Sequence, residues 1–271
     1  MNWRGSRGRS LVALGFFLAR RGVTAWIGLG LTVACVVGFG ALAVVLARHG
    51  KTETLPDVPL VASSALAFGI GVLVAFAAST RAFRRDEDDG IRALLRARGV
   101  TTSGYLAGRL AGLAACLAAL VSGGSFLVGL VALFAARGRL TALHTLQASV
   151  SAAIFGVAFA LAFGPVAMAT LGGRSRSAGY LALLSVLVVP ELVAPTLERY
   201  VAHRWVEVCS IPGALAALRT SIAPVGVDPS MLGRALTALV VIMVTSLLII
   251  RAELARAHGT ADAPRSGHPP T

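Results

Sequence analysis

The sequence predicts an all-α integral membrane protein with six transmembrane helices and an amphipathic, interfacial helix at the N-terminus. Of the 271 residues, 56% are hydrophobic and 14% are charged, against about 45–50% and about 25% in soluble domains. The mean hydropathy is +0.79. Long uncharged apolar blocks also alternate with short segments that contain arginine. Together these observations exclude an ordinary soluble domain and a disordered chain, because both are poorer in apolar residues.

The positive charge of the chain fits the same class. The formal net charge is +13, and 24 of the 25 basic residues are arginines, with Lys51 as the one lysine. A nucleic-acid-binding domain would gather such charge on one face of a soluble domain. Here the arginines lie between apolar blocks, where membrane proteins carry the basic residues that set their orientation. We therefore expect membrane lipids, and no nucleic acid, as partners.

Residues 1–22 are predicted to form a cytoplasmic N-terminus with a helix in the membrane interface. Arginines stand on both sides of the short apolar run Leu11–Ala19. The run has the length of a secretory signal, but Arg20-Arg21-Gly22 follows it in place of a small-residue cleavage site, and another apolar block begins at once. An apolar run anchored by arginine at both ends is typical of an interfacial helix.

Six apolar blocks without charged side chains follow within a transmembrane domain that covers residues 23–250. They are Val23–Ala47, Val58–Ser79, Leu110–Ala136, Ala148–Thr170, Ser177–Pro190 and Ala235–Ile250. A helix that crosses a bilayer needs about 20 residues, so the last two blocks must include neighbouring residues. The third block, with the approach from Gly104, is one long span, and Ser122-Gly123-Gly124-Ser125 predicts a bend in it.

The distribution of basic residues predicts the orientation. With the N-terminus inside, the cytoplasmic segments hold 17 of the 25 basic residues and the outer segments hold eight. The cytoplasmic segments are 1–22, 79–109, 171–176 and 251–271, and the outer ones are 48–57, 137–147 and 191–234. The positive-inside rule therefore predicts cytoplasmic N- and C-termini. Residues 191–234 form a long, proline-rich outer connection, and 251–271 is expected to be a cytoplasmic, largely disordered tail.

The spans carry little that suggests chemistry. The first four contain no Asp, Glu, Lys, Arg or His, whereas carriers driven by ion gradients normally keep such residues at membrane depth. Gly50-Lys51-Thr52 resembles the end of a P-loop, but Val45 stands where the first glycine belongs. His203 and Glu207 fall four residues apart, but a zinc site needs three or four ligands. We expect no catalytic residue, no cofactor and no metal in this chain.

The most informative segment is the loop 79–109, which predicts a short amphipathic helix over Asp86–Arg98. Four carboxylates stand at its beginning and arginines at its end, which suits the helix dipole. We expect Asp88 to pair with Arg92 four residues later and Gly99 to end the helix.

Ile91, Leu94 and Leu95 form one small apolar stripe on this helix. The stripe could pack against the ends of neighbouring spans, or it could dock into a groove on a soluble partner. The composition leaves both readings open.

The loop resembles that of ABC-2 type transporter permeases. The resemblance lies in Asp88-Asp89-Gly90-Ile91, Leu94-Leu95, Gly99-Val100-Thr101, Tyr105-Leu106 and Gly108-Arg109-Leu110. In that family the loop between the second and third spans forms a coupling helix, which sits in a groove of the ATPase subunit. The chain departs from the family where Arg98-Gly99-Val100-Thr101 replaces a Pro-Val-Ser or Pro-Ile-Ser turn and where Arg109 replaces a frequent lysine.

The resemblance implies a permease subunit of an ATP-binding-cassette exporter in the plasma membrane, the bacterial inner membrane. A separate ATPase subunit would bind ATP and Mg, and a second permease protomer would complete the path, as a homo- or heterodimer. Two alternatives stay open. One is the membrane subunit of a haem-exporter-type cytochrome c maturation system, which has a similar loop. The other is a stand-alone secondary carrier.

The resemblance also names candidate site residues. The partner-binding surface would comprise Asp88, Asp89, Gly90, Ile91, Arg92, Leu94, Leu95, Arg96 and Gly99, with Ile91, Leu94 and Leu95 as the docked face. After the loop, Gly104, Gly108 and Gly112 recur every four residues and share one helix face. Small residues at this spacing let helices approach closely in lipid, either within one protomer or across a dimer.

Overall fold

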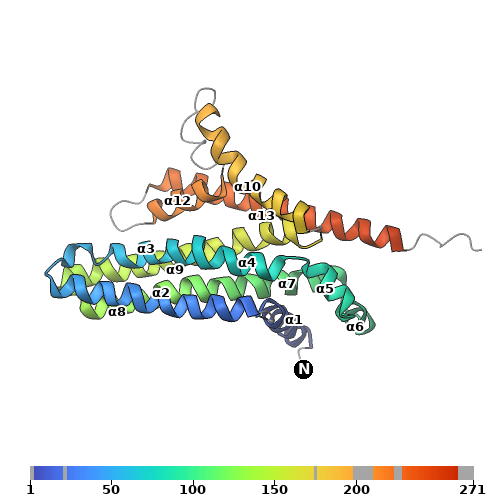
Figure 1. Cartoon of the computed structure of the whole chain (residues 1–271), viewed down its shortest axis with the longest axis horizontal. Helices are drawn as coiled ribbons and strands as arrows, with labels where there is room; N and C mark the ends of the chain where they lie inside the picture. The colour runs from blue at the N-terminus through green and yellow to red at the C-terminus, as the bar shows by residue number, and fades with distance from the viewer. Residues whose placement is uncertain (1–2, 21–22, 174–175, 198–209, 223–227, 262–271) are drawn as a thin grey trace, which may run out of the picture.

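The computed structural model describes residues 3–20, 23–173, 176–197, 210–222 and 228–261, and throughout these ranges every regular element is a helix (Figure 1). The helices are α1 (Trp3–Arg20), α2 (Val23–Arg48), α3 (Asp57–Ala65), α4 (Val72–Ser79), α5 (Ala82–Asp88), α6 (Ile91–Ala97), α7 (Thr102–Ala118), α8 (Gly124–Ala135), α9 (Arg139–Leu171), α10 (Arg176–Leu197), α12 (Ile211–Ser221) and α13 (Pro229–Ala261). A 3₁₀ turn η1 (Thr52–Thr54) and two π-helical turns, η2 (Leu66–Gly71) and η3 (Ala119–Gly123), complete the chain order.

The six predicted spans match six helical segments of the described residues in number and order. Six helical segments are long and apolar enough to cross a membrane, which is compatible with an integral membrane protein. They are Trp26–Arg48, Asp57–Asp88, Thr102–Ala135, Arg139–Leu171, Ser177–Ala194 and Pro229–Ala252. The last two predicted blocks were too short to cross a bilayer alone. The helices α10 and α13 extend beyond these blocks, as predicted.

The last helix is longer than predicted. α13 runs to Ala261, so part of the tail expected from residue 251 is helical. Alanine and leucine are frequent after Arg251, and their high helix propensity favours continuation of the helix. The remainder of the expected tail, residues 262–271, lies outside the described residues.

A π-helical turn, η3, lies where a bend is predicted in the third span. η3 joins α7 to α8 without ending the helix, and it overlaps the Ser122–Ser125 segment. A second π turn, η2, joins α3 to α4 and was not predicted. The two turns contact one another, and the Ser122 hydroxyl donates a 2.7 Å hydrogen bond to the Ala153 carbonyl of α9. The two π-helical turns, η2 and η3, therefore lie beside each other in the bundle.

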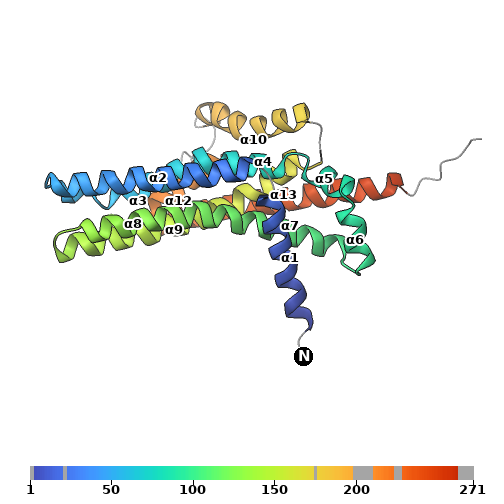
Figure 2. The same ribbon diagram turned by 60° about the horizontal axis from the view of Figure 1, so that its bottom comes forward.

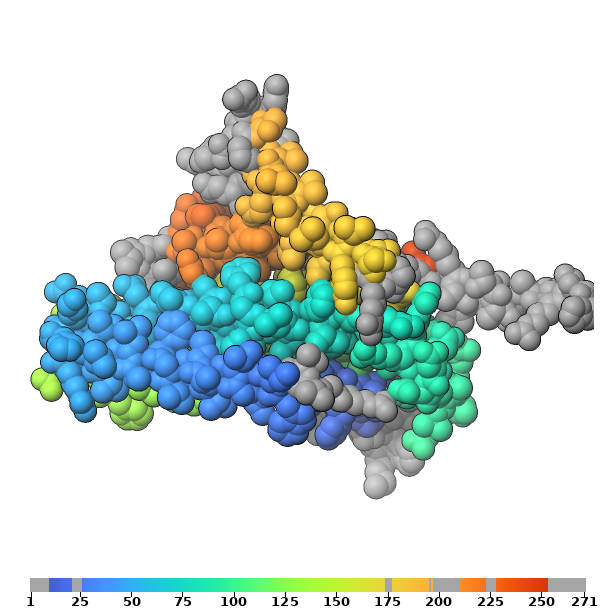
Figure 3. Space-filling view, in the orientation of Figure 1, coloured from blue at the N-terminus to red at the C-terminus, as the bar shows by residue number. Residues whose placement is uncertain are grey.

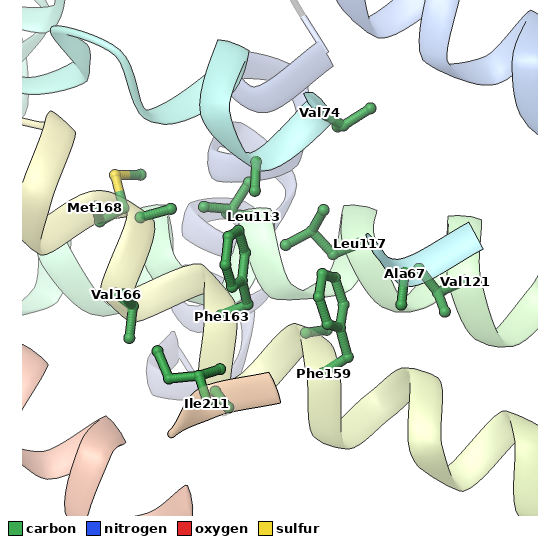
Figure 4. Close-up of a cluster of buried hydrophobic side chains, with 14 of the residues drawn as sticks. Ala67, Val74, Leu113, Leu117, Val121, Phe159, Phe163, Val166, Met168 and Ile211 are labelled. Atoms are coloured by element: carbon green, nitrogen blue, oxygen red, sulfur yellow. The ribbon is translucent and has the colours of Figure 1, made fainter. Parts of the chain in front are cut away.

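The core is centred on α9, which contacts α3, α4, α7, α8, α10, α12 and α13. Phe155, Phe159 and Phe163 recur every four residues on one face of α9 and are almost completely buried. Phe159 and Phe163 stack with ring centroids 5.2 Å apart, and they pack against Leu113 and Leu117 of α7 (Figure 4). This aromatic stripe holds the second, third and fourth spans together.

One end of the bundle carries α1, α5, α6 and the C-terminal end of α13 (Figures 1 and 2). The connections from α2 to α3 and from α8 to α9 lie at the opposite end. A chain that crosses a membrane six times begins and ends on the same side. The position of α1 and of the end of α13 at one end of the bundle is compatible with this. The helix predicted at the N-terminus is α1, which leaves the bundle at a steep angle and packs on α7 (Figure 2).

The fifth span contacts α9 but is the least buried of the six. α10 projects from the body of the molecule (Figure 3) and little of it is buried. It continues through Glu191, whose carboxylate accepts a hydrogen bond from the Ser210 hydroxyl before α12. By contrast, α12 packs on the bundle: the Ser151 hydroxyl of α9 donates to the Ile222 carbonyl at 2.6 Å, and the Arg219 guanidinium donates to the Ser64 hydroxyl at 2.5 Å.

Candidate functional site

The loop between the second and third spans contains two helices rather than one. The single helix predicted over Asp86–Arg98 is wrong, because Gly90 adopts a left-handed φ of 70° between α5 and α6. Its carbonyl then accepts a 3.0 Å hydrogen bond from the Leu94 amide and starts α6. Asp86 and Asp88 consequently lie in the last turn of α5 and not in the first turn of the expected helix.

The beginning of the loop is fastened to the end of α9. Arg81 has a left-handed φ of 55°, the one positive φ of a non-glycine residue in the described ranges. Its amide donates to the Leu171 carbonyl at 3.0 Å, and the Phe83 amide donates to the Gly172 carbonyl at 3.1 Å. The last turn of a helix leaves carbonyls without partners, so these two bonds both complete α9 and hold Arg81 in a rare conformation.

The phenyl ring of Phe83 covers the same helix end. A Cβ atom on Gly172 would lie 2.6 Å from this ring, so only glycine allows the contact. The loop therefore meets the most buried span through both hydrogen bonds and packing.

A buried polar cluster joins α5 to α7. The side chains of Asp86 and Arg109 are 2% and 5% exposed, and Arg109 Nε lies 3.3 Å from Asp86 Oδ2. The Tyr105 hydroxyl donates a 2.5 Å hydrogen bond to the same carboxylate oxygen. Tyr105 and Arg109 are four residues apart and so share one face of α7. Because an unpaired buried charge is very costly, this pairing fixes α5 against the third span.

Sequence reasoning missed this cluster. The sequence pattern assigns Asp86 only to the first turn of a helix, together with three other carboxylates, whereas its side chain is buried. Arg109 was read only as a family position. The available signal was the Tyr105–Arg109 spacing, which places a phenol and a cation on one helix face beside a carboxylate-rich loop.

The apolar stripe predicted on α6 is divided between the interior and the surface. Leu95 is 9% exposed and belongs to the core, whereas Leu94 is 55% exposed. Ile91 is half-buried and packs against the core. The stripe therefore both packs on neighbouring spans and leaves one leucine at the surface.

Gly99 ends α6, as predicted. It has a φ of 71°, its amide donates to the Arg96 carbonyl at 2.8 Å, and the Val100 amide donates to the Leu95 carbonyl at 2.9 Å. This pair of bonds is the Schellman closure of a helix end.

The expected pairing of Asp88 with Arg92 is not formed. Arg92 is 8% exposed and its Nη1 atom lies 3.5 Å from Oε2 of Glu87, which is 65% exposed. The expected pair required Asp88 and Arg92 to lie one turn apart in a single helix, and the turn at Gly90 separates them into two helices. Of the predicted partner-binding residues, six are exposed: Asp88, Asp89, Gly90, Leu94, Arg96 and Gly99.

Two of the three predicted packing glycines lie against α1. A Cβ atom on Gly108 would lie 2.9 Å from the Leu11 carbonyl oxygen, and one on Gly112 would lie 2.2 Å from the Gly15 carbonyl carbon. These neighbours are backbone atoms and cannot rotate away. Gly104 instead faces the Thr101 hydroxyl, which accepts its amide at the start of α7. The glycine seam, here Gly15, Gly108 and Gly112, therefore joins α1 to α7 within one chain.

A cleft of about 710 Å³ lies beside the loop, between α1, the end of α6 and the start of α7. Its walls are mainly apolar, from Leu11, Leu14 and Val100, and Arg98 lies at its edge. Within the described ranges, no three His, Cys, Asp or Glu side chains gather closely enough to hold a metal ion. His203 and Glu207 lie outside those ranges. The loop is thus a surface fastened to two spans.

Comparison of the chain with models of protein families and with curated proteins finds no match.

Proposed function

We propose that this chain is the membrane-spanning permease subunit of an ABC-2 type exporter, and that α5 and α6 form its coupling helices. The carrying observation is the buried Asp86–Arg109 pair, which ties an exposed cytoplasmic loop to a span. A loop that only connected two spans would need no such pair. The motif of the loop, including Asp89-Gly90 and Leu94-Leu95, supports the same assignment.

In this proposal the exposed residues of α5 and α6 face a separate ATPase subunit. Leu94 supplies the apolar contact, and Asp88, Asp89 and Arg96 surround it as a polar rim. ATP and Mg are bound and hydrolysed by the partner, and this chain contributes no catalytic group. The end of the bundle that carries α1 and the loop is cytoplasmic, because most of the basic residues belong to it.

Closure of two ATPase subunits on ATP would then push α5 and α6 of each of two permease protomers. The push reaches α7 through Asp86 and Arg109, and it reaches α9 through the bonds from Arg81 and Phe83. Both α7 and α9 contribute side chains to the core. A displacement of the loop is therefore converted into a displacement of the third and fourth spans.

The decisive test uses the leucine that the structure leaves exposed. Leu94→Glu should weaken binding of a P-loop ATPase by about 10- to 100-fold, since losing one buried apolar anchor costs about 1.5–3 kcal/mol. The readout is MgATP hydrolysis in the affinity-purified membrane complex. Leu140→Glu is the matched control, because Leu140 is 74% exposed at the start of α9. Leu95 is unsuitable because it is buried. Undiminished hydrolysis after Leu94→Glu would overturn the docking assignment, and transport without any ATPase would support a stand-alone carrier.

A further inference from the structure

A second, smaller groove of about 220 Å³ lies between α1, α2, α4, the end of α7 and η3. Arg20 and Trp26 form its polar edge, and Leu29, Val74 and Leu120 line its apolar part. Trp26 is 57% exposed and Leu29 is 42% exposed, so the groove opens sideways from the bundle. In a membrane, this opening faces lipid.

Among the described residues, no carboxylate neutralises the positive charge of Arg20 at the edge of the groove. The Arg20 guanidinium lies 4.9 Å from the centroid of the Trp26 ring, and within the described part of the chain it forms no ion pair. A cation over an indole face is held electrostatically. The ring therefore orients the guanidinium while leaving its N–H donors available for an anion.

The groove is polar at one end and apolar at the other, as a lipid molecule is. Arg20 is the last residue of α1 and Trp26 begins the first span, so both lie at the level where tryptophan and arginine mark the membrane interface. Leu29, Val74 and Leu120 lie within spans. A ligand that fills the groove must be anionic at one end and apolar at the other.

We propose that this groove binds one anionic phospholipid, with its phosphate on Arg20 and an acyl chain along Leu29, Val74 and Leu120. The guanidinium fork matches two phosphate oxygens. A zwitterionic choline lipid fits less well, because its own cation would compete with Arg20 for the Trp26 face. The bound lipid closes the gap between α1 and the first two spans. This inference does not depend on the proposed transport function.

The test follows the fluorescence of Trp26 in the full chain after Trp3→Phe and Trp205→Phe remove the other two tryptophans. The protein is reconstituted in phosphatidylcholine vesicles that contain phosphatidylglycerol, with bromine on the acyl chains of one lipid or the other. At equal mole fractions, brominated phosphatidylglycerol should bind and quench with about fivefold preference, the effect of about 1 kcal/mol per interfacial arginine.

Three variants make the result specific. Arg20→Gln should abolish the preference for phosphatidylglycerol, and Arg20→Lys should restore part of it. Arg48→Gln, at the far end of α2, is the matched control and should leave the preference unchanged. Equal quenching by both lipids, or an unchanged preference after Arg20→Gln, would overturn the proposal. Loss of the preference on adding inorganic phosphate, but not chloride at equal ionic strength, would mean that the groove binds free phosphate and would overturn it too.

Discussion

The Asp86 carboxylate of α5 and the Arg109 guanidinium of α7 form an ion pair from which water is almost completely excluded. Arg109 Nε and Nη1 have no hydrogen-bond partner among the described residues, so the nearby carboxylate is the main compensation for the buried charge. Tyr105 uses its hydroxyl to orient that carboxylate. The stability of this region therefore depends on keeping both charges or removing both.

Removing one charge should be much worse than removing two. Asp86→Asn leaves Arg109 buried and unpaired, and should lower the free energy of unfolding by about 3–5 kcal/mol. The double variant Asp86→Leu with Arg109→Met should recover most of that loss, because apolar residues of similar size can replace a buried pair. Chemical unfolding of the detergent-solubilised protein measures both values. A small effect of Asp86→Asn would show that the pair does not stabilise the fold.

Tyr105→Phe serves as the graded control for the same cluster. It removes one hydrogen bond to a charged group but keeps the ion pair, so the expected loss is about 1.5–3 kcal/mol. In combination with Asp86→Asn its effect should be smaller than in the parent chain, because its partner has already changed.

Substitution of glycine by alanine should have opposite effects inside and outside the glycine seam. Gly112→Ala places a methyl group within the backbone of α1 and should destabilise the protein by about 1–3 kcal/mol. Gly38→Ala in α2 meets no atom within 4 Å, and should stabilise it by about 0.5–1 kcal/mol through backbone entropy. The midpoint of thermal unfolding of the two variants provides the comparison. Equal shifts of the same sign would contradict a tight α1–α7 contact.

The beginning of α13 predicts a local pH dependence. Hydrogen bonds from the Ser230 hydroxyl and from the amides of Met231 and Ser230 lower the pKa of Asp228 below its usual value. Since the folded pKa is depressed, the carboxylate stabilises this helix start above the ordinary pKa of aspartate, and the stabilisation is lost as the pH falls through the lowered value. Amide exchange of the first turn, corrected for intrinsic rates, should therefore accelerate in acid. Asp228→Ala should remove this dependence, whereas Asp228→Ser should retain a cap without it.

Length and charge were sufficient to predict the six spans, because a stretch without charged residues must avoid water along its whole length. Gly99 was predicted to end a helix for a similarly local reason. The left-handed conformation that it adopts is accessible to few other residue types. These features depend on neighbours in the sequence.

The division of the loop and the burial of Asp86 could not be predicted in the same way. Gly90 was read as part of a helix, since nothing local distinguishes an interior glycine from one that separates two helices. The environment of Asp86 is set by Tyr105, 19 residues later, and by Arg109 on the same face of α7. Leu94 and Leu95 likewise look equivalent in the sequence, and only the position of α6 against the bundle separates them.

The two π turns change how substitutions in the second and third spans must be interpreted. Each turn adds one residue to the regular i→i−4 ladder, so the helical phase shifts between α3 and α4, and again between α7 and α8. A residue four or seven positions away across either turn does not share a face with its counterpart. Mutational scans of this protein should therefore be analysed as four half-spans, each with its own lipid-facing side.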